Sequence, residues 1–224
     1  MRPESIERHV DSGAKPRDTS RDLLVAACAC ALLSLLIGFV VGAGFGRAFD
    51  RGLLLQIALR TGRDADWLIT VFRAISWLSD SGQRSFMVLL VAAWLIWKQR
   101  RRAALVVMIV PILAGVTNSI LKEAFGRARP EIVPHLDQIG NLAYPSGHAS
   151  NAMAFFLLAA FLLGPSNATR WRILAISVAV TVGMSRLALG VHWPSDVIGG
   201  WLWGASFALA GYHIAMCKCA RFRG

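Results

Sequence analysis

Charged residues are scarce in this 224-residue chain: 17% are Asp, Glu, Lys or Arg, against about 25% in an average soluble domain. The apolar share is 55%, which excludes a disordered chain, a collagen-like chain and a small disulfide scaffold. Residues 23–46 and 197–217 form two stretches without any charge, of 24 and 21 residues. Both exceed the roughly 18–20 apolar residues that cross a bilayer core. The composition therefore predicts a polytopic membrane protein.

Cysteine is also rare. The four cysteines form two C-x-C pairs, Cys28 with Cys30 and Cys217 with Cys219, and this is not the C-x2–4-C spacing of structural zinc sites. Both pairs are expected near the cytoplasmic surface, where disulfides rarely persist. The sequence thus predicts no disulfide framework, no metal and no other cofactor.

Six apolar segments are predicted to span the membrane. They are Leu23–Phe45, Ser81–Trp97, Ala103–Leu121, His148–Leu163, Ile173–Leu189 and Pro194–Cys217. A cleaved signal peptide is the alternative for the first segment, but its apolar run exceeds the ~7–15 residues of such a leader. The predicted fold is therefore all-α, a six-span transmembrane helical bundle that forms a single domain over residues 23–217.

Residues 47–80 are mixed in charge and are predicted to form an extracytoplasmic amphipathic segment. Apolar side chains recur at helical spacing in Leu53–Leu59 and again in residues 68–78. Charges at Arg60, Arg63 and Asp64 interrupt the segment. This pattern favours helices that lie in the membrane interface over a further span.

The net charge of +11 is explained in large part by orientation. Lys and Arg collect on the cytoplasmic side of membrane proteins, and 14 of the 24 fall on one side of the predicted bundle. They lie in a disordered tail at residues 1–22, in the loops 98–102 and 170–172, and in a basic tail at residues 218–224. Both termini are therefore expected in the cytoplasm.

Three polar clusters fall on the opposite, extracytoplasmic side of the predicted bundle. They read Lys122-Glu-Ala-Phe-Gly-Arg-Ala-Arg129-Pro130, then Pro145-Ser146-Gly147-His148, then Ser185-Arg186 followed by His192-Trp-Pro-Ser-Asp196. Each cluster adjoins the end of a predicted span at the same depth. Packing of the six helices would therefore bring the clusters together in one site.

The residue types in these clusters suit an anion that carries phosphate. Lys122, Arg129 and Arg186 supply three positive charges, and Arg grips phosphate in a bidentate manner. Ser146 suits the N-cap position of the helix that follows, and Gly147 would let a ligand approach the backbone. Free N–H groups at such a helix start bind anions. The clusters thus predict a site for a phosphate ester or a pyrophosphate.

Two histidines supply the chemistry. One imidazole can attack phosphorus, and the other can protonate the leaving oxygen. Asp196 follows His192 by four residues and would hold it in one tautomer, provided that the loop folds back. His192 is therefore the predicted nucleophile. His148, whose own motif contains no carboxylate, is the predicted general acid.

Two further interpretations concern residues between the clusters. Arg127 is expected to face lipid headgroups. His135 and Asp137, together with Glu131, suggest a metal site as an alternative, but the potential ligands are few and lie in a loop.

The three clusters resemble the signature of the type 2 phosphatidic acid phosphatase and vanadium haloperoxidase superfamily, which reads K-x6-RP, PSGH and SR-x5-H-x3-D. All eleven specified positions match in order, within a similar region at about residues 85–213. The resemblance implies a metal-independent phosphatase that works through a phosphohistidine. It implies the same roles for His192, Asp196 and His148. By the same resemblance, the phosphate ligands are Lys122, Arg129, Ser146, Gly147 and Arg186.

The resulting hypothesis is a lipid phosphatase of a bacterial cytoplasmic membrane, with its site facing the periplasm or exterior. Undecaprenyl pyrophosphate is the favoured substrate on grounds of family alone, with phosphatidylglycerophosphate, phosphatidate and lipid A phosphates as others. A phosphotransferase with the same site, a vanadate-dependent haloperoxidase and a non-enzymatic lipid transporter or assembly protein are the alternatives. The expected partner is a membrane lipid and not nucleic acid, and the oligomeric state is left open.

Overall fold

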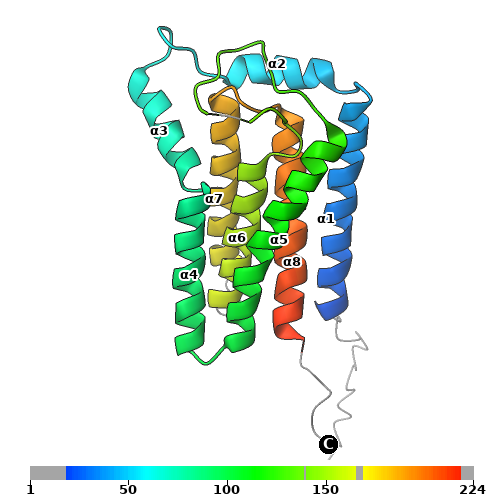
Figure 1. Ribbon diagram of the computed structural model, residues 1–224, viewed down its shortest axis with the longest axis vertical. Coiled ribbons are helices and arrows are strands. Elements are labelled where there is room, and N and C mark those ends of the chain that lie inside the picture. The colour runs from blue at the N-terminus through cyan, green and yellow to red at the C-terminus, as the bar shows by residue number, and fades with distance from the viewer. Residues whose placement is uncertain (1–18, 139, 165–168, 218–224) are drawn as a thin grey trace, which may run out of the picture.

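The structure is a computed structural model that describes residues 19–138, 140–164 and 169–217. The predicted tail at residues 1–22 lies almost wholly outside this part of the chain, and the tail at residues 218–224 lies outside it entirely. The described residues form eight helices and one isolated bridge, between Ala128 and Leu142 (Figure 1). The helices are α1 (Thr19–Gly42), α2 (Arg47–Ile57), α3 (Asp66–Trp77), α4 (Ser81–Trp97), α5 (Arg101–Phe125), α6 (Gly147–Leu163), α7 (Thr169–Ala188) and α8 (Pro194–Met216).

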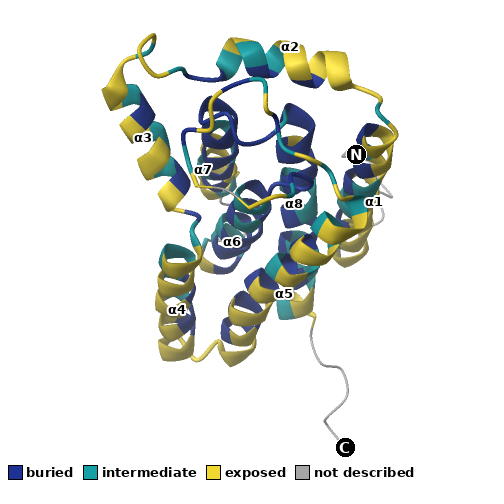
Figure 2. Ribbon diagram, turned by 45° about the horizontal axis from the view of Figure 1, so that its top comes forward, coloured by how far each residue is buried: buried dark blue, intermediate teal, exposed yellow. Residues whose placement is uncertain are grey.

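Six of these helices, α1 and α4–α8, form a bundle, and α2 lies across one end of it (Figure 1). We call this end the α2 end. α6 is the central helix because it packs against α5, α7 and α8, and ten of its 17 residues are buried (Figure 2). A helix that is apolar on all sides is expected in such a position. The prediction of an all-α fold is confirmed.

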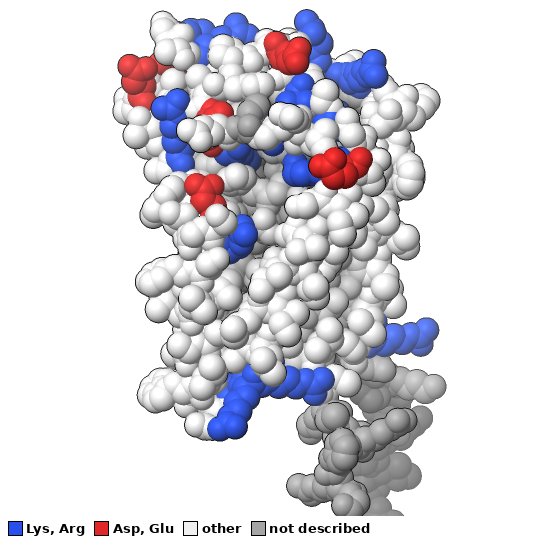
Figure 3. Space-filling model, in the orientation of Figure 1, with Lys and Arg blue, Asp and Glu red and all other residues white. Residues whose placement is uncertain are grey.

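The outer surface of the bundle is that of a membrane protein. Figure 3 shows charged side chains toward the two ends and a broad uncharged band between them. Large apolar side chains are exposed on the outer helices, among them Leu32, Phe39, Phe86 and Ile112, and a continuous apolar surface of this kind marks contact with lipid. By length and composition α1, α5 and α7 can cross a membrane, whereas α4 and α6 are apolar but shorter. The count of six spans stays a prediction.

The end of α5 positions the first polar cluster. The helix continues one turn beyond the predicted end at Leu121, so Lys122 lies in its last turn. Gly126 then adopts the left-handed conformation, with φ 57°, and its N–H donates to the carbonyl of Lys122 at 2.9 Å. Such a cap is favourable for glycine and stops the helix. The chain therefore turns at this point toward the α2 end.

The first interfacial helix is displaced from its prediction. The apolar pattern placed it at Leu53–Leu59, whereas α2 begins at Arg47 and ends at Ile57. Its first turn contains Asp50, which is buried and ion-paired. Apolar periodicity cannot detect a helical turn that buries a charge, which is why the prediction began too late. The second predicted helix, over residues 68–78, appears as α3, but it runs steeply toward α4 and not across the end of the bundle as α2 does (Figure 1), and its position in the interface stays a prediction.

Small residues allow α6 and α8 to approach each other closely. A Cβ added at Gly200 would lie 2.6 Å from the carbonyl oxygen of Ser146, and one at Gly204 would lie 2.9 Å from the Cβ of Met153. The two glycines therefore lie where the helices touch. In α1, Gly38 lies in such a close contact as well, whereas a Cβ at Gly42 would meet no atom within 4 Å.

We expect Gly204→Ala to lower the stability of the bundle by about 1–3 kcal/mol, because the new methyl group would overpack the α6–α8 contact. The measurement is the midpoint of thermal unfolding in one detergent. Gly42→Ala is the matched control and should leave the midpoint unchanged or raise it. Equal midpoints for the two variants would contradict the packing argument.

Candidate active site

The three polar clusters meet at the α2 end of the bundle. The first follows α5, the second begins α6, and the third connects α7 to α8. Nη1 of Arg129 lies 3.1 Å from Nε2 of His192, which joins the first cluster to the third. The backbone N–H of Ser146 donates to the carbonyl of Asp196 at 2.9 Å, which joins the second to the third. Residues far apart in the sequence thus surround one small volume.

His192 is buried, and its two ring nitrogens have different partners. Because a guanidinium can only donate, Nε2 is the acceptor in the contact with Arg129. Nδ1 then carries the proton and lies 3.4 Å from Oδ2 of Asp196. Burial, followed by the positive charges of Arg129 and Lys122, lowers the pKa of His192 well below its ordinary value. At neutral pH the imidazole is therefore neutral, with a lone pair on Nε2.

Asp196 lies in the first turn of α8, after Pro194 at the start of the helix. Its Oδ2 accepts the backbone N–H of Trp193 at 2.8 Å, so the carboxylate caps the helix and faces His192 at the same time. From the sequence, a contact between His192 and Asp196 was expected only if the loop that contains His192 folds back. The loop does fold back, and the N–H of Val191 donates to the carbonyl of Arg186 at 3.1 Å.

Lys122 and Arg129 hold the surrounding loops in place. Nζ of Lys122 donates to the carbonyl of Leu142 at 2.8 Å. Nε of Arg129 donates to the carbonyl of Gly140 at 2.6 Å, and its Nη1 donates to the carbonyl of Val191 at 2.6 Å. Burial, together with the nearby Arg186, lowers the pKa of Arg129 to about 10. The Arg129 side chain therefore remains cationic at neutral pH.

Two buried polar atoms beside these cations have no hydrogen-bond partner among the described residues. They are Oγ of Ser146 and Nε of Arg186. Ser146 occupies the N-cap position of α6 as predicted, but its side chain makes no cap hydrogen bond, so the expected capping role is wrong. A buried polar atom without a partner is costly, and an incoming anion that accepts from both atoms would remove that cost.

The start of α6 adds backbone donors to the same place. The first N–H groups of a helix have no partner within the helix, and Gly147 and His148 are its first two residues. A Cβ at Gly147 would lie 3.4 Å from Oδ1 of Asn118, so the backbone is closely packed on that side. Together with the cations, this arrangement suits a phosphate group.

Arg186 is buried on α7, and its Nη1 donates to Ser76 of α3 and to Asp137 of the loop that precedes α6. Neither partner was singled out from the sequence as a neighbour of this cation. Asp137 appeared there only in the alternative metal site, which the described contacts do not favour. His135 contacts the carbonyl of Pro130 instead, and within the described ranges no three His, Cys, Asp or Glu side chains form a group that could hold a metal ion.

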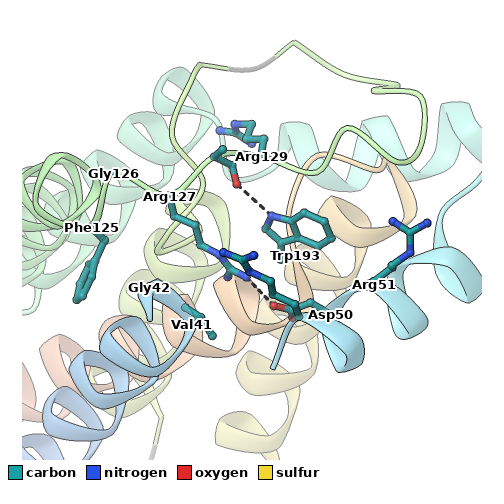
Figure 4. Close-up of a pocket in the computed structure, with 11 residues that line it drawn as sticks. Val41, Gly42, Asp50, Arg51, Phe125, Gly126, Arg127, Arg129 and Trp193 are labelled. Carbon is teal, nitrogen blue, oxygen red and sulfur yellow. Dashed lines mark hydrogen bonds and ion pairs between the residues drawn. The ribbon is translucent and has the colours of Figure 1, made fainter. Parts of the chain in front are cut away.

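The expectation that Arg127 faces lipid headgroups is wrong. Its Nη2 donates to Asp50 at 2.6 Å (Figure 4), and its Nη1 donates to Asp196 at 2.5 Å. Asp50 also accepts the backbone N–H and the hydroxyl of Ser195, at 2.9 and 2.7 Å. The guanidinium thus connects α2 to the catalytic candidate Asp196. In the sequence, the only indication of this bridge is that acidic and basic residues alternate in the segments that form the α2 end.

Figure 4 also shows the indole of Trp193 beside the pair of Arg127 and Asp50, and its Nε1 donates to the carbonyl of Ala128 at 3.0 Å. This places a large ring over the Arg127 guanidinium, 5.8 Å from the ring centre.

His148 has a carboxylate partner outside its own motif. Its Nε2 lies 2.8 Å from Oδ1 of Asp80, the residue that immediately precedes α4. The hydroxyl of Ser79 donates to the carbonyl of His148 at 3.1 Å. The sequence offered no spacing that pairs residues 80 and 148.

We expect Arg127→Met to destabilise the protein by about 3–5 kcal/mol, because two buried carboxylates would lose the cation between them. The measurement is the denaturant or thermal midpoint in detergent. Arg63→Met is the control, since Arg63 pairs with Asp64 at 3.0 Å but has a side chain that is 54% exposed. Equal small effects in both variants would show that the buried bridge is dispensable.

Comparisons with known proteins identify relatives whose names are those of lipid phosphatases. The lipid A 1-phosphatase of Rhizobium etli is 30% identical over 197 residues, which is 84% of this chain and 81% of that protein. The match to the lipid A 1-phosphatase of Rhizobium johnstonii is 36% identical but spans only 44% of this chain and 42% of the relative. The undecaprenyl-diphosphatase of Sulfolobus acidocaldarius is 34% identical over 61% of this chain and 67% of its own length.

A similar structure is also known. The crystal structure of a transmembrane PAP2 type phosphatidylglycerolphosphate phosphatase from Bacillus subtilis has a TM-score of 0.77 and 26% identity, and the match covers 88% of this chain and 98% of that one. The profile of the PAP2 superfamily matches residues 102–217, which contain all three polar clusters. The chain therefore belongs to the PAP2 superfamily.

Proposed function

We propose that this protein is an integral-membrane phosphatase that hydrolyses a lipid phosphate or pyrophosphate through a phosphohistidine on His192. One observation carries the proposal. Nδ1 of His192 lies 3.4 Å from Oδ2 of Asp196, and its Nε2 lies 3.1 Å from Nη1 of Arg129. A nucleophilic nitrogen that faces a phosphate-binding cation is what attack on phosphorus requires.

The reaction has two steps in this proposal. Nε2 of His192 attacks phosphorus, the bond from phosphorus to the leaving oxygen breaks, and protonated His148 gives that oxygen a proton. Neutral His148 then takes a proton from water, which attacks the phosphohistidine and releases phosphate. Lys122, Arg129 and Arg186 stabilise the charge on the phosphoryl oxygens, and Ser146 and Gly147 add donors at the start of α6.

A groove between α4 and α5 supports a lipid substrate. It has a volume of about 210 Å³ and an apolar lining that includes Val88, Leu89, Met108 and Ile112. Arg84 lies in the first turn of α4, at the end of the groove nearer the α2 end. A lipid whose tail occupies this groove would present its phosphate toward the α2 end.

The finer assignments are also part of this proposal. All six bundle helices span a bacterial cytoplasmic membrane, with both termini in the cytoplasm and the α2 end facing the periplasm or exterior, because the basic loops lie at the opposite end. Undecaprenyl pyrophosphate is the first substrate to test. The names of the relatives support adding phosphatidylglycerophosphate and lipid A 1-phosphate.

The direct test is phosphate release from these three lipids and phosphatidate in mixed micelles. His192→Ala should reduce release to background with every lipid while the protein stays folded, because the nucleophile is lost. His213→Ala is the matched control, since His213 lies in the last turn of α8, at the opposite end of the bundle, and should retain full activity. The lipid hydrolysed with the highest kcat/KM identifies the substrate class.

The covalent step has its own readout. Brief incubation with a 32P-labelled lipid followed by denaturation should leave label on the wild type that is stable in alkali and lost in acid, as expected for phosphohistidine. Full activity in His192→Ala, or label on that variant, would refute the mechanism.

The pH profile of kcat/KM should extend far into the acid range. The neutral form of His192 is the reactive form, and its lowered pKa means that protonation removes activity only well below the ordinary value of 6.5. Arg129→Gln deletes one cause of that lowering, so the acid limb should move to higher pH even though the rate falls. The measurement is kcat/KM from about pH 4 to pH 9. If the acid limb does not move, Arg129 does not influence the pKa of His192.

A further inference from the structure

The contact between Asp80 and His148 joins a residue outside every motif to the proposed general acid. Oδ1 of Asp80 lies 2.8 Å from Nε2 of His148, and the side chains are 47% and 26% exposed. Asp80 precedes α4 but makes no side-chain cap to that helix. Its carboxylate is therefore directed at the imidazole and not at its own helix.

Ser79, the residue before Asp80, holds the junction between α3 and α4 against the same histidine. The Ser79 side chain is buried, and its hydroxyl donates to the carbonyl of His148 at 3.1 Å. Arg84 in turn donates from Nη1 to the carbonyl of Ser79 at 3.1 Å. The α3–α4 junction is thus bound to both the main chain and the side chain of His148, in the first turn of α6.

The charges around His148 indicate what Asp80 does at this site. Burial of this imidazole and the charge of Arg186 on α7 both oppose a positive charge on the ring, whereas Asp80 and Asp137 favour one. A general acid must carry a proton while the positive phosphate ligands surround it. Asp80 is the carboxylate in direct contact, and so it offsets the cation nearest to the acid.

The contact also selects the nitrogen that acts. With Nε2 donating to Asp80, the other ring nitrogen, Nδ1, has no hydrogen-bond partner in the described part of the chain. Nδ1 is therefore the nitrogen that is free to meet a leaving oxygen.

We infer that Asp80 is a positioning residue for leaving-group protonation, which rests on the function proposed above. Its carboxylate accepts a hydrogen bond from Nε2–H of His148 and favours the imidazolium form of the ring, against the effects of burial and of Arg186. The Nδ1 proton then passes to the leaving oxygen as the bond between phosphorus and that oxygen breaks. In the second step Nδ1 takes a proton from water, and the Asp80 contact is unchanged throughout.

This role predicts a dependence on the leaving group. The alkoxide expelled from phosphatidate is a strong base and needs a proton during bond breaking, whereas p-nitrophenolate leaves without one. General acid catalysis contributes about 10²–10⁴-fold where it is needed. A purely structural role for Asp80 would reduce turnover of both substrates alike.

The experiment compares kcat/KM for phosphatidate and for p-nitrophenyl phosphate in the full-length protein in detergent. Asp80→Asn should lower kcat/KM for phosphatidate by about tenfold or more and change that for p-nitrophenyl phosphate less than about threefold. Asn is as good as Asp at a helix start, so α4 is preserved. Asp64→Asn is the matched control, a carboxylate near the α2 end that is paired with Arg63, and should match the wild type with both substrates.

Two more variants test whether Asp80 acts through His148. Asp80→Glu should recover part of the phosphatidate activity, and adding Asp80→Asn to His148→Ala should cause no further loss, because both changes remove one function. The role of Asp80 would be overturned if Asp80→Asn lowered kcat/KM equally for both substrates. It would also be overturned if the losses from Asp80→Asn and His148→Ala added up in the double variant. A wild type that releases phosphate from none of the four lipids of the panel and not from p-nitrophenyl phosphate would instead refute the proposed function.

Discussion

The Arg127 guanidinium, held between Asp50 and Asp196, is the interaction on which the α2 end depends. Two buried carboxylates that share one cation are stable only when good geometry and further hydrogen bonds offset the loss of water. Ser195 supplies those bonds, by donating to Asp50 from its backbone and its hydroxyl. The orientation of Asp196, and through it that of His192, therefore depends on a helix that lies across the bundle and contains none of the motif residues.

In the proposed mechanism, different surroundings divide one residue type between two tasks. His192 is fully enclosed and faces cations, which lowers its pKa and leaves a neutral, nucleophilic nitrogen. His148 is partly exposed and contacts the carboxylate of Asp80, which offsets part of the effect of burial and of Arg186 against the protonated ring. Different environments for paired titratable groups are how proteins separate base or nucleophile from acid at one pH. The difference arises from Arg129 on one side and Asp80 on the other.

The sequence predicted the parts of this protein that depend on local pattern. Uncharged stretches located the bundle helices, and motif spacing located His148, His192 and the cations around them. The sequence did not predict the side chains from distant parts of the chain that contact these residues. Asp50 and Asp80 belong to a segment whose charges seemed only to interrupt an amphipathic pattern, and Arg127 seemed to be a surface residue. Pairings between distant residues leave no periodic signal, because tertiary packing alone decides which charge is buried.

The distance along the chain between Asp50 and Ser195, 145 residues, has a consequence for biosynthesis. Five further helices, α3 to α7, are made before the N–H and hydroxyl of Ser195 become available to this carboxylate at the start of α8. Its other donor, Arg127, is made earlier, directly after α5. A nascent chain that has inserted only the earlier helices still lacks Asp196, the second carboxylate that contacts Arg127. The buried network at the α2 end is therefore closed only when α8 has been made, so the helix made second reaches its final contacts together with the helix made eighth.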